Sequence, residues 1–98
     1  MTKEKTFENK VKSYLKSKGA WVVKFFANGF TQKGVPDLLC CLNGRFLAIE
    51  IKSENGRPSP LQLYTIDEIK KANGLALVLY PHNFDEFKQT IEALLTSS

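Results

Sequence analysis

The sequence predicts an α/β domain with a mixed central sheet, one helix before the first strands and further helices after them. Three features predict it: a first half rich in short β-prone segments, an Asn43-Gly44 pair between two of them, and a helical segment before the last strand. An Asn-Gly pair favours the type I′ turn of an antiparallel hairpin, whereas a helical crossover joins parallel strands. The 98 residues leave room for one domain, which we expect to span residues 1–98.

The first half of the chain is expected to form a helix followed by three strands. Apolar residues at helical spacing predict a helix over residues 4–18 that ends at Gly19. β-prone runs predict strands at the following segments: residues 21–26, 37–42 and 45–52.

The second half is expected to alternate between helix and strand. Ser59 as N-cap and Pro60 at the first helical position begin a helix that runs to about residue 73, with Gly74 as the residue just beyond its end. An almost purely apolar run at residues 75–80 predicts a buried strand. Asn83, with Glu86 three residues on, predicts the capping box of a last helix that reaches about residue 95.

The composition narrows the function classes. The net charge of +4 is uneven, because residues 1–24 carry +5 and residues 25–98 carry −1, which points weakly to a polyanion partner such as nucleic acid. One histidine, His82, argues against histidine-centred chemistry, and Cys40 and Cys41 are adjacent, which excludes a CxxC zinc pair. We expect no membrane span, no signal peptide and no organic cofactor, and therefore a reduced, cytoplasmic protein of a bacterial or phage-infected cell.

The expected hairpin brings two carboxylates together. If Asn43 and Gly44 form the turn, the register places Asp37 directly opposite Glu50, with Cβ atoms roughly 4.5–5.5 Å apart. Lys52 lies two residues beyond Glu50 and therefore on the same face of the strand. The alternative is a surface strand with unrelated solvated charges, but opposed acids destabilise a sheet and such local conflicts mark functional sites.

Paired carboxylates at this spacing are typical of a site for a divalent cation. Mg²⁺ prefers carboxylate and carbonyl oxygens and keeps several bound waters. A water facing Lys52 could attack a phosphate while the cation polarises the phosphoryl oxygen. The three charges therefore predict metal-dependent hydrolysis of a phosphodiester.

These residues also carry a family resemblance. Gly-Val-Pro-Asp-Leu-Leu at residues 34–39 and Ile-Glu-Ile-Lys at residues 49–52 resemble the PD-(D/E)XK nuclease signature. Ser-Pro-Leu-Gln at residues 59–62 makes the chain similar to the VRR-NUC (virus-type replication-repair nuclease) family, in particular its stand-alone phage and bacterial members. The resemblance covers nearly the whole chain and implies a restriction-endonuclease-like core of order α-β-β-β-α-β with an extra C-terminal helix.

The resemblance implies roles for individual residues. Asp37 and Glu50 correspond to acids that bind Mg²⁺ or Mn²⁺, with the backbone carbonyl of Ile51 as a further ligand, and Lys52 corresponds to the residue that positions the attacking water. Glu8 is the candidate for the helix-1 acid of the family; by helical periodicity it lies about 20° from Leu15, at the edge of the apolar stripe. Its alternative is a solvent-facing glutamate paired with Lys12.

Gln62 has two possible roles. The resemblance places it in the catalytic site, after the catalytic lysine. The same residues, 59–62, also form an S-x-x-Q capping box, in which the glutamine side chain turns back to the N–H of Ser59. Capping is one way in which the family could position this side chain.

The partner is expected to be branched or structured DNA of the Holliday-junction or flap type, bound by a homodimer. Lys24, Lys33 and Arg57 are candidate phosphate contacts, and residues 28–34 form the loop most suited to meet the DNA. The closest rivals are a Holliday-junction resolvase of the archaeal type and a restriction-like enzyme, although Ser-Pro-x-Gln favours VRR-NUC. A rival of another class is a catalytically silent DNA-binding or protein-docking module with the same fold.

Overall fold

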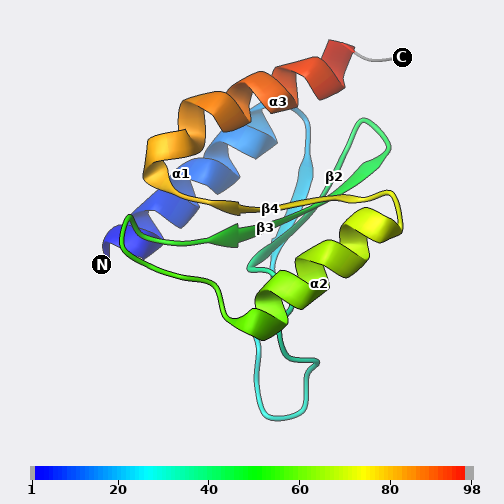
Figure 1. The fold of residues 1–98 in the computed structure, drawn as a ribbon. Coiled ribbons are helices and arrows are strands. Elements are labelled where there is room, and N and C mark those ends of the chain that lie inside the picture. The colour runs from blue at the N-terminus through cyan, green and yellow to red at the C-terminus, as the bar shows by residue number, and fades with distance from the viewer. Residues whose placement is uncertain (1, 97–98) are drawn as a thin grey trace.

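The computed structural model describes residues 2–96 and has the expected order of elements (Figure 1). A 3-10 turn, η1, between the last strand and the last helix was not expected. The elements are α1 (Lys3–Ser17), β1 (Trp21–Lys24), β2 (Leu38–Leu42), β3 (Arg45–Ile51), α2 (Pro60–Lys71), β4 (Leu75–Leu79), η1 (Pro81–Asn83) and α3 (Phe84–Thr96).

The four strands form one mixed sheet in the order β1-β2-β3-β4. The β1–β2 and β2–β3 pairs are antiparallel, and α2 crosses over so that β4 lies parallel to β3. Leu42 pairs with Arg45 across the turn, in which Asn43 and Gly44 have φ of 52° and 78°. Positive φ at both positions is the signature of a type I′ turn, so the expected register is confirmed.

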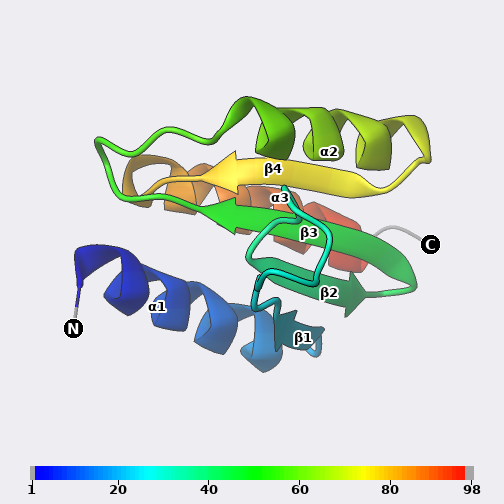
Figure 2. The ribbon, with the colours of Figure 1, turned by 90° about the horizontal axis from the view of Figure 1, so that it is seen from below.

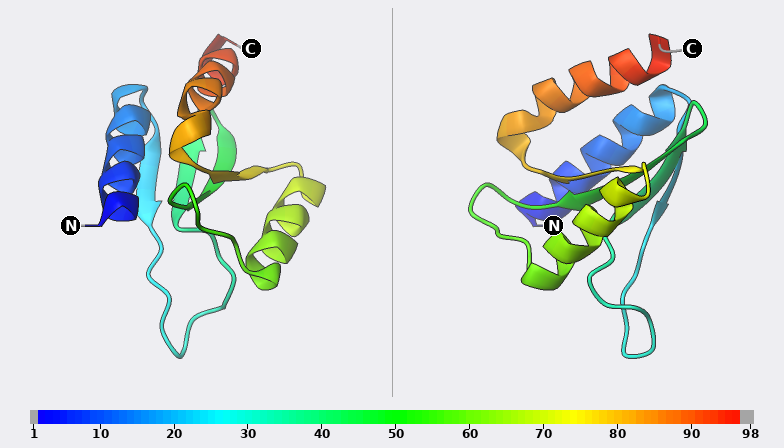
Figure 3. Two further views of the ribbon diagram at one scale, coloured as in Figure 1. Left: turned by 60° about the vertical axis from the view of Figure 1, so that its left-hand side comes forward. Right: turned by 45° about the vertical axis from the view of Figure 1, so that its right-hand side comes forward.

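Helices cover both faces of the sheet, and the main core lies under α1 and α3. Figure 3 shows α1 and α3 on one side of the sheet and α2 on the other. Alternate residues of β2 and β3 face the first side, because side chains alternate along a strand. This core contains the following buried residues: Phe7, Val11, Leu15, Leu38, Cys40, Leu42, Leu47, Ile49, Ile51, Leu79, Phe84, Phe87 and Ile91.

A smaller core lies on the opposite face, where α2 packs against only part of the sheet. Ile66 of α2 is buried there with Ala48 and Ala76. Figure 2 shows α2 running along β4, away from β1. Trp21 of β1 and Phe46 of β3 are therefore 63% and 45% exposed. Within residues 2–96, no helix covers the half of this face formed by β1 and β2.

Four element ends differ from the expectation. β1 ends at Lys24 instead of residue 26, and Asp37 and Lys52 lie just outside β2 and β3. At the end of α2, Asn73 and not Gly74 takes the left-handed conformation, with φ of 71°. The N–H of Gly74 donates to the carbonyl of Ile69 in a Schellman motif, so the glycine is the second residue beyond the cap.

The start of the last helix also differs. Asn83, expected as its N-cap, belongs to the 3-10 turn, and its side-chain oxygen accepts from the N–H of Tyr80 at 2.9 Å. α3 begins at Phe84. Pro81 favours this arrangement, because proline fixes φ near −65° and lacks an N–H that the turn would have to satisfy.

Gly34 fixes the approach of the loop that precedes Asp37. Its φ is +82°, and a Cβ built on it would lie 2.7 Å from Cγ of Leu61 and 2.9 Å from the Leu61 carbonyl oxygen. Both constraints exclude a side chain, so the loop passes directly against the first turn of α2. This contact holds the residues before Asp37 beside the helix that carries Gln62.

We expect Gly34→Ala to lower the free energy of unfolding by about 2 kcal/mol or more, because it combines a strained φ with a steric clash. Urea unfolding followed by circular dichroism measures this loss. The matched control is Gly29→Ala in the same loop, where a Cβ meets nothing within 4 Å. Equal stability of the two variants would contradict the close approach.

Candidate active site

Asp37 connects the ends of β1, β2 and β3 at the open end of the β2–β3 hairpin. Its backbone carbonyl accepts from the N–H of Phe25 at 2.7 Å, which prolongs the β1–β2 ladder. Its side-chain Oδ2 accepts from the N–H of Ile51 at 2.9 Å, in place of a backbone bond to β3. The carboxylate is therefore held in a fixed orientation at the end of β3.

Glu50 is a buried acid with one unsatisfied oxygen. It lies on β3 and is 2% exposed. Its Oε2 accepts from Gln62 at 2.8 Å and lies 3.3 Å from the ammonium of Lys52. Oε1 is buried and, among the described residues, has no hydrogen-bond partner. Burial and the charge of Asp37 raise the pKa of Glu50, against the lowering effect of Lys52.

Lys52 directly follows β3 and remains close to Glu50. Its backbone N–H donates to the carbonyl of Leu79 at 3.0 Å, so its position is still fixed by β4. Its side chain is 19% exposed, and its aliphatic part passes against Gly56, where an added Cβ would meet it at 3.3 Å. The ammonium thus lies 3.3 Å from Oε2 of Glu50, on the side that the spacing of the two residues predicts.

Gln62 completes the capping box and also contacts Glu50. Its Oε1 accepts from the N–H of Ser59 at 2.8 Å, and the Ser59 hydroxyl accepts from the N–H of Gln62, which completes the capping box. Its Nε2 donates to Oε2 of Glu50 at 2.8 Å. The cap therefore holds the amide in the orientation that reaches Glu50.

Glu8 lies inside the protein instead of facing solvent. It is 4% exposed and contacts the ammoniums of Lys24 at 2.7 Å and Lys5 at 2.9 Å, so the alternative of a solvated pair with Lys12 is wrong. Burial raises the pKa of Glu8, but hydrogen bonds and charge attraction from Lys24 and Lys5 lower it more, and the net pKa lies below its ordinary value.

Lys24 is at the site and not on an open surface. Its ammonium lies 2.7 Å from Oε1 of Glu8 and 3.2 Å from Oδ1 of Asp37. Burial lowers the pKa of Lys24, but the two carboxylates raise it above its ordinary value. From the sequence, Lys24 is expected to contact a phosphate. Strand alternation is the signal for its actual position, because Lys24 shares a strand face with Val22, and this face packs toward α1.

The donor set at Asp37 and Glu50 fits a hard divalent cation. Two carboxylates and the nearby backbone of Ile51 offer oxygen ligands, and the unsatisfied Oε1 of Glu50 is the kind of buried acceptor that a cation would satisfy. Nevertheless, no group of three His, Cys, Asp or Glu side chains within residues 2–96 is close enough to hold a metal ion. Glu8, the third acid, is engaged by Lys24 and Lys5.

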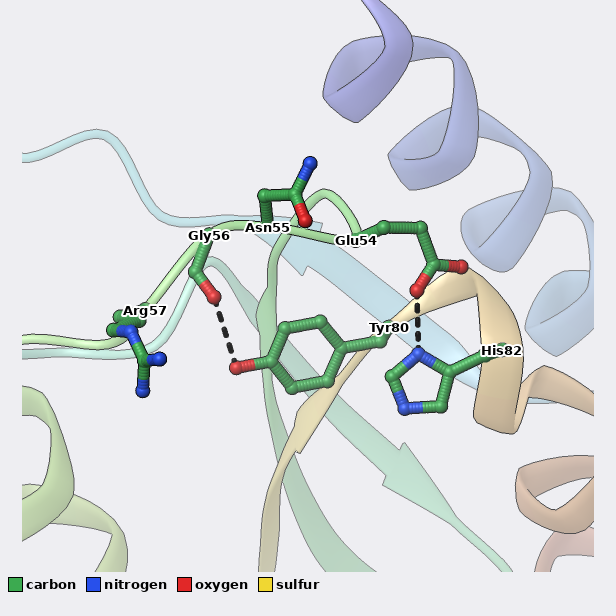
Figure 4. Close-up of a pocket in the computed structure, with 6 residues that line it drawn as sticks. All are labelled: Glu54, Asn55, Gly56, Arg57, Tyr80 and His82. Carbon is green, nitrogen blue, oxygen red and sulfur yellow. Dashed lines mark hydrogen bonds and ion pairs between the residues drawn. The ribbon is translucent and has the colours of Figure 1, made fainter.

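The two other candidate DNA contacts lie on loops. Lys33 is exposed on the loop before Asp37. Arg57 lines a surface pocket of about 230 Å³ beyond Lys52, together with Glu54, Asn55, Gly56, Tyr80 and His82 (Figure 4). In this pocket the Tyr80 hydroxyl donates to the carbonyl of Gly56, and His82 pairs with Glu54.

The histidine and the cysteines take no part in the site. His82 lies in the turn before α3 and stacks on Tyr80 with ring centroids 5.1 Å apart, in agreement with its expected place at a helix entry. Cys40 is buried and Cys41 is exposed, as expected for neighbours on a strand. Burial raises the pKa of Cys40 to about 12, which keeps its thiol protonated and unreactive.

The two buried glutamates should respond in opposite ways to removal of their charge. Because the pKa of Glu8 is lowered, its carboxylate stabilises the fold above its ordinary value of 4.5, and this stabilisation is lost as the pH falls through the lowered pKa. Because the pKa of Glu50 is raised, its ionisation destabilises the fold, and this cost disappears as the pH falls below 4.5.

We therefore expect Glu8→Gln to lower the melting temperature at pH 7 and Glu50→Gln to raise it, with both differences from wild type shrinking below pH 4.5. Thermal melts between pH 3 and pH 8 in the presence of a chelator measure this. Glu68→Gln is the control, since Glu68 is an exposed acid of a surface pair and should change little. A lower melting temperature for Glu50→Gln at pH 7 would contradict the assigned cost.

Two comparisons with known proteins agree with this geometry. The family model described as archaeal Holliday junction resolvase (Hjc) matches residues 1–80. A solved structure described as a VRR_NUC domain superposes with a TM-score of 0.77 at 30% sequence identity, and the match covers 94% of this chain and 97% of that one. No curated protein matches the chain.

These matches also bear on the rivals considered from the sequence. The archaeal resolvase, which we had set against VRR-NUC, is itself a relative, so the Ser-Pro-x-Gln segment does not separate the two. The expected α-β-β-β-α-β core and the C-terminal helix are confirmed. By its sequence match to the Hjc resolvases and its structural match to a VRR_NUC domain, the chain belongs to the PD-(D/E)XK nucleases.

Proposed function

We propose that this protein is a metal-dependent endonuclease that hydrolyses phosphodiester bonds in branched or structured DNA. The observation that carries the proposal is the grouping of Asp37, Glu50 and Lys52 at the end of one hairpin, with a buried carboxylate oxygen of Glu50 left unsatisfied. Membership of the resolvase and VRR_NUC families supports a DNA substrate with a branch.

Each residue has a distinct part in the proposed reaction. Asp37, Glu50 and the carbonyl of Ile51 would hold Mg²⁺ or Mn²⁺, with Glu8 as the third acidic candidate. When bound there, the cation would polarise a phosphoryl oxygen and lower the pKa of a bound water. Lys52 orients the attacking water and offsets charge in the transition state. Gln62 is a positioning residue, because its amide holds Oε2 of Glu50 and leaves Oε1 free.

DNA contact is proposed along the surfaces that border this site. Lys33 and Arg57 contact phosphates, and the lysines of α1 add positive charge to the same polyanion-binding surface. None of the elements in the described part of the chain resembles a base-reading helix, so we propose recognition of DNA shape. The place of action is the cytoplasm of a bacterial or phage-infected cell. Within residues 2–96, no helix is both long and apolar enough to cross a membrane.

We also propose that the protein acts as a homodimer through the uncovered half of the sheet. Trp21, Cys41 and Phe46 lie side by side across β1, β2 and β3, and all three are exposed. Such an apolar patch marks an interaction surface. A second copy is the proposed occupant, because a two-fold contact would give a small domain two sites with which to hold a branched DNA.

The nuclease proposal predicts cleavage of four-way or flap DNA in the presence of Mg²⁺ or Mn²⁺. We expect Asp37→Ala and Lys52→Ala each to lower the cleavage rate by about a hundredfold or more, because the first removes a proposed metal ligand and the second removes the group proposed to orient the attacking water. Gel assays with labelled four-way, flap and linear DNA measure the rates.

Matched controls are Asp67→Ala and Lys71→Ala, which make the same changes at an exposed pair on α2 and should cleave like wild type. The rival of a silent DNA-binding module predicts that the wild type binds branched DNA and cuts none of the substrates. Cleavage that is equal in the wild type and the Asp37 and Lys52 variants would also refute the proposal.

The dimer proposal predicts that Trp21→Glu and Phe46→Glu shift the protein from dimer to monomer, because each places a charge within the proposed interface. Sedimentation velocity at micromolar concentration measures the change. Gln89→Glu is the control, since it adds a charge on the exposed side of α3, across the sheet from the patch. A wild type that sediments as a monomer and cleaves DNA as such would overturn the proposal.

A further inference from the structure

The charged side chains at the site balance one another without a metal. Three carboxylates are in contact with three ammoniums, at distances between 2.7 and 3.3 Å. The carboxylates are those of Glu8, Asp37 and Glu50, and the ammoniums are those of Lys5, Lys24 and Lys52. A divalent cation that binds here therefore enters a site whose negative charge is already compensated, and it has to compete with an ammonium.

Lys24 is the ammonium that stands between two acids from different elements. Its Nζ lies 2.7 Å from Oε1 of Glu8 on α1 and 3.2 Å from Oδ1 of Asp37 before β2. Lys5, by contrast, pairs with Glu8 of its own helix, and Lys52 pairs with Glu50 two residues before it in the sequence. Lys24 thereby connects α1 to the hairpin, because its ammonium lies between Glu8 and Asp37.

Both carboxylate oxygens of Asp37 are engaged in this arrangement. Oδ2 accepts from the N–H of Ile51 at 2.9 Å, and Oδ1 accepts from Lys24. The bond from Ile51 comes from a backbone N–H at the end of β3. The contact with Lys24 is longer and comes from a flexible side chain. The oxygen that Asp37 can give up to another cation at least cost is therefore Oδ1.

We propose that Lys24 is the internal cation of the metal-free site, and that its ammonium leaves Asp37 when a divalent cation binds while it stays on Glu8. The inference rests on the proposed metal binding by Asp37 and Glu50. The shorter contact to Glu8 is the one retained. Lys24 is thus a positioning residue that holds the acids in place before metal binding and reduces the affinity of the metal.

A competing Lys24 and a supporting Lys24 predict opposite effects on metal affinity when the residue is replaced. If Lys24 oriented Asp37 for the metal, its removal would weaken binding. As a competing cation, its removal frees Oδ1 and takes away a repulsive charge, so binding becomes tighter. The sign of the change separates the two roles.

The test is isothermal titration of the full chain with Mn²⁺, without DNA. We expect Lys24→Met, which keeps the length of the side chain but not its charge, to bind Mn²⁺ roughly tenfold more tightly than wild type, a change that corresponds to about 1.4 kcal/mol. Lys24→Arg keeps the charge and should remain close to wild type. Lys70→Met removes an exposed lysine of α2 and controls for the change in net charge.

A second readout is the melting temperature with and without metal. In a chelator, Lys24→Met should melt below wild type, because Glu8 loses the closer of its two ammoniums. With excess Mn²⁺ it should gain more than wild type does, because tighter binding to the folded state stabilises it further. Circular dichroism spectra verify that the variant is folded.

The outcomes separate this inference from the proposed function. If the wild type and Lys24→Met bind Mn²⁺ with equal affinity, or the variant binds more weakly while folded, Lys24 is not a competing cation, and the metal site itself stands. If neither protein binds Mn²⁺ at a saturable site, the proposed metal centre fails and this inference fails with it. If Lys70→Met tightened Mn²⁺ binding as much as Lys24→Met does, the change in net charge would explain the effect, and the inference would be overturned.

Discussion

The hydrogen bond from the N–H of Ile51 to the side chain of Asp37 is the interaction on which the site depends. The β2–β3 backbone pairing ends at Leu38 and Ile49, so a carboxylate takes over from the backbone at the next position. This substitution fixes the orientation of Asp37 while its carbonyl still pairs with Phe25 of the neighbouring chain segment. Asp37 thus lies where the β1–β2 and β2–β3 hydrogen-bond ladders both end. The close contact of Gly34 with Leu61 fixes the path of the chain just before Asp37.

The site contains one group that is unfavourable for stability, the buried carboxylate of Glu50. Glu50 is as buried as a core leucine, yet one of its oxygens has no partner among the described residues. Such a group costs free energy that a neutral amide would spare, because burial disfavours the charged form. The capping box of α2 supports this group, since Gln62 supplies one bond to the neighbouring oxygen and leaves the other in place. A fold selected for stability alone would have no reason to keep the acid.

The hairpin part of the site could be predicted from the sequence, whereas the α1 part could be predicted only incompletely. A two-residue Asn43-Gly44 turn fixes the register, so the opposition of Asp37 and Glu50 follows from counting. The bridge from Lys24 to Glu8 depends on pairing β1 with β2 across a long loop, and no local signal encodes that pairing. The helix ends show the same limit: Asn73 and Gly74 both permit the left-handed turn, and tertiary contacts with Ile69 decide between them.

Glu8 and Glu50 are both buried glutamates, but their pKa values are shifted in opposite directions. Both are nearly inaccessible, so burial acts on both in the same direction. Two ammoniums reach Glu8 and lower its pKa, whereas Glu50 has the single ammonium of Lys52 and the repulsion of Asp37, and its pKa is raised. Glu8 is therefore satisfied by the protein itself, whereas Oε1 of Glu50 has no hydrogen-bond partner among the described residues. An added cation gains most at Glu50 and Asp37, which is the side of the site where the attacking water and Lys52 would meet a DNA phosphate.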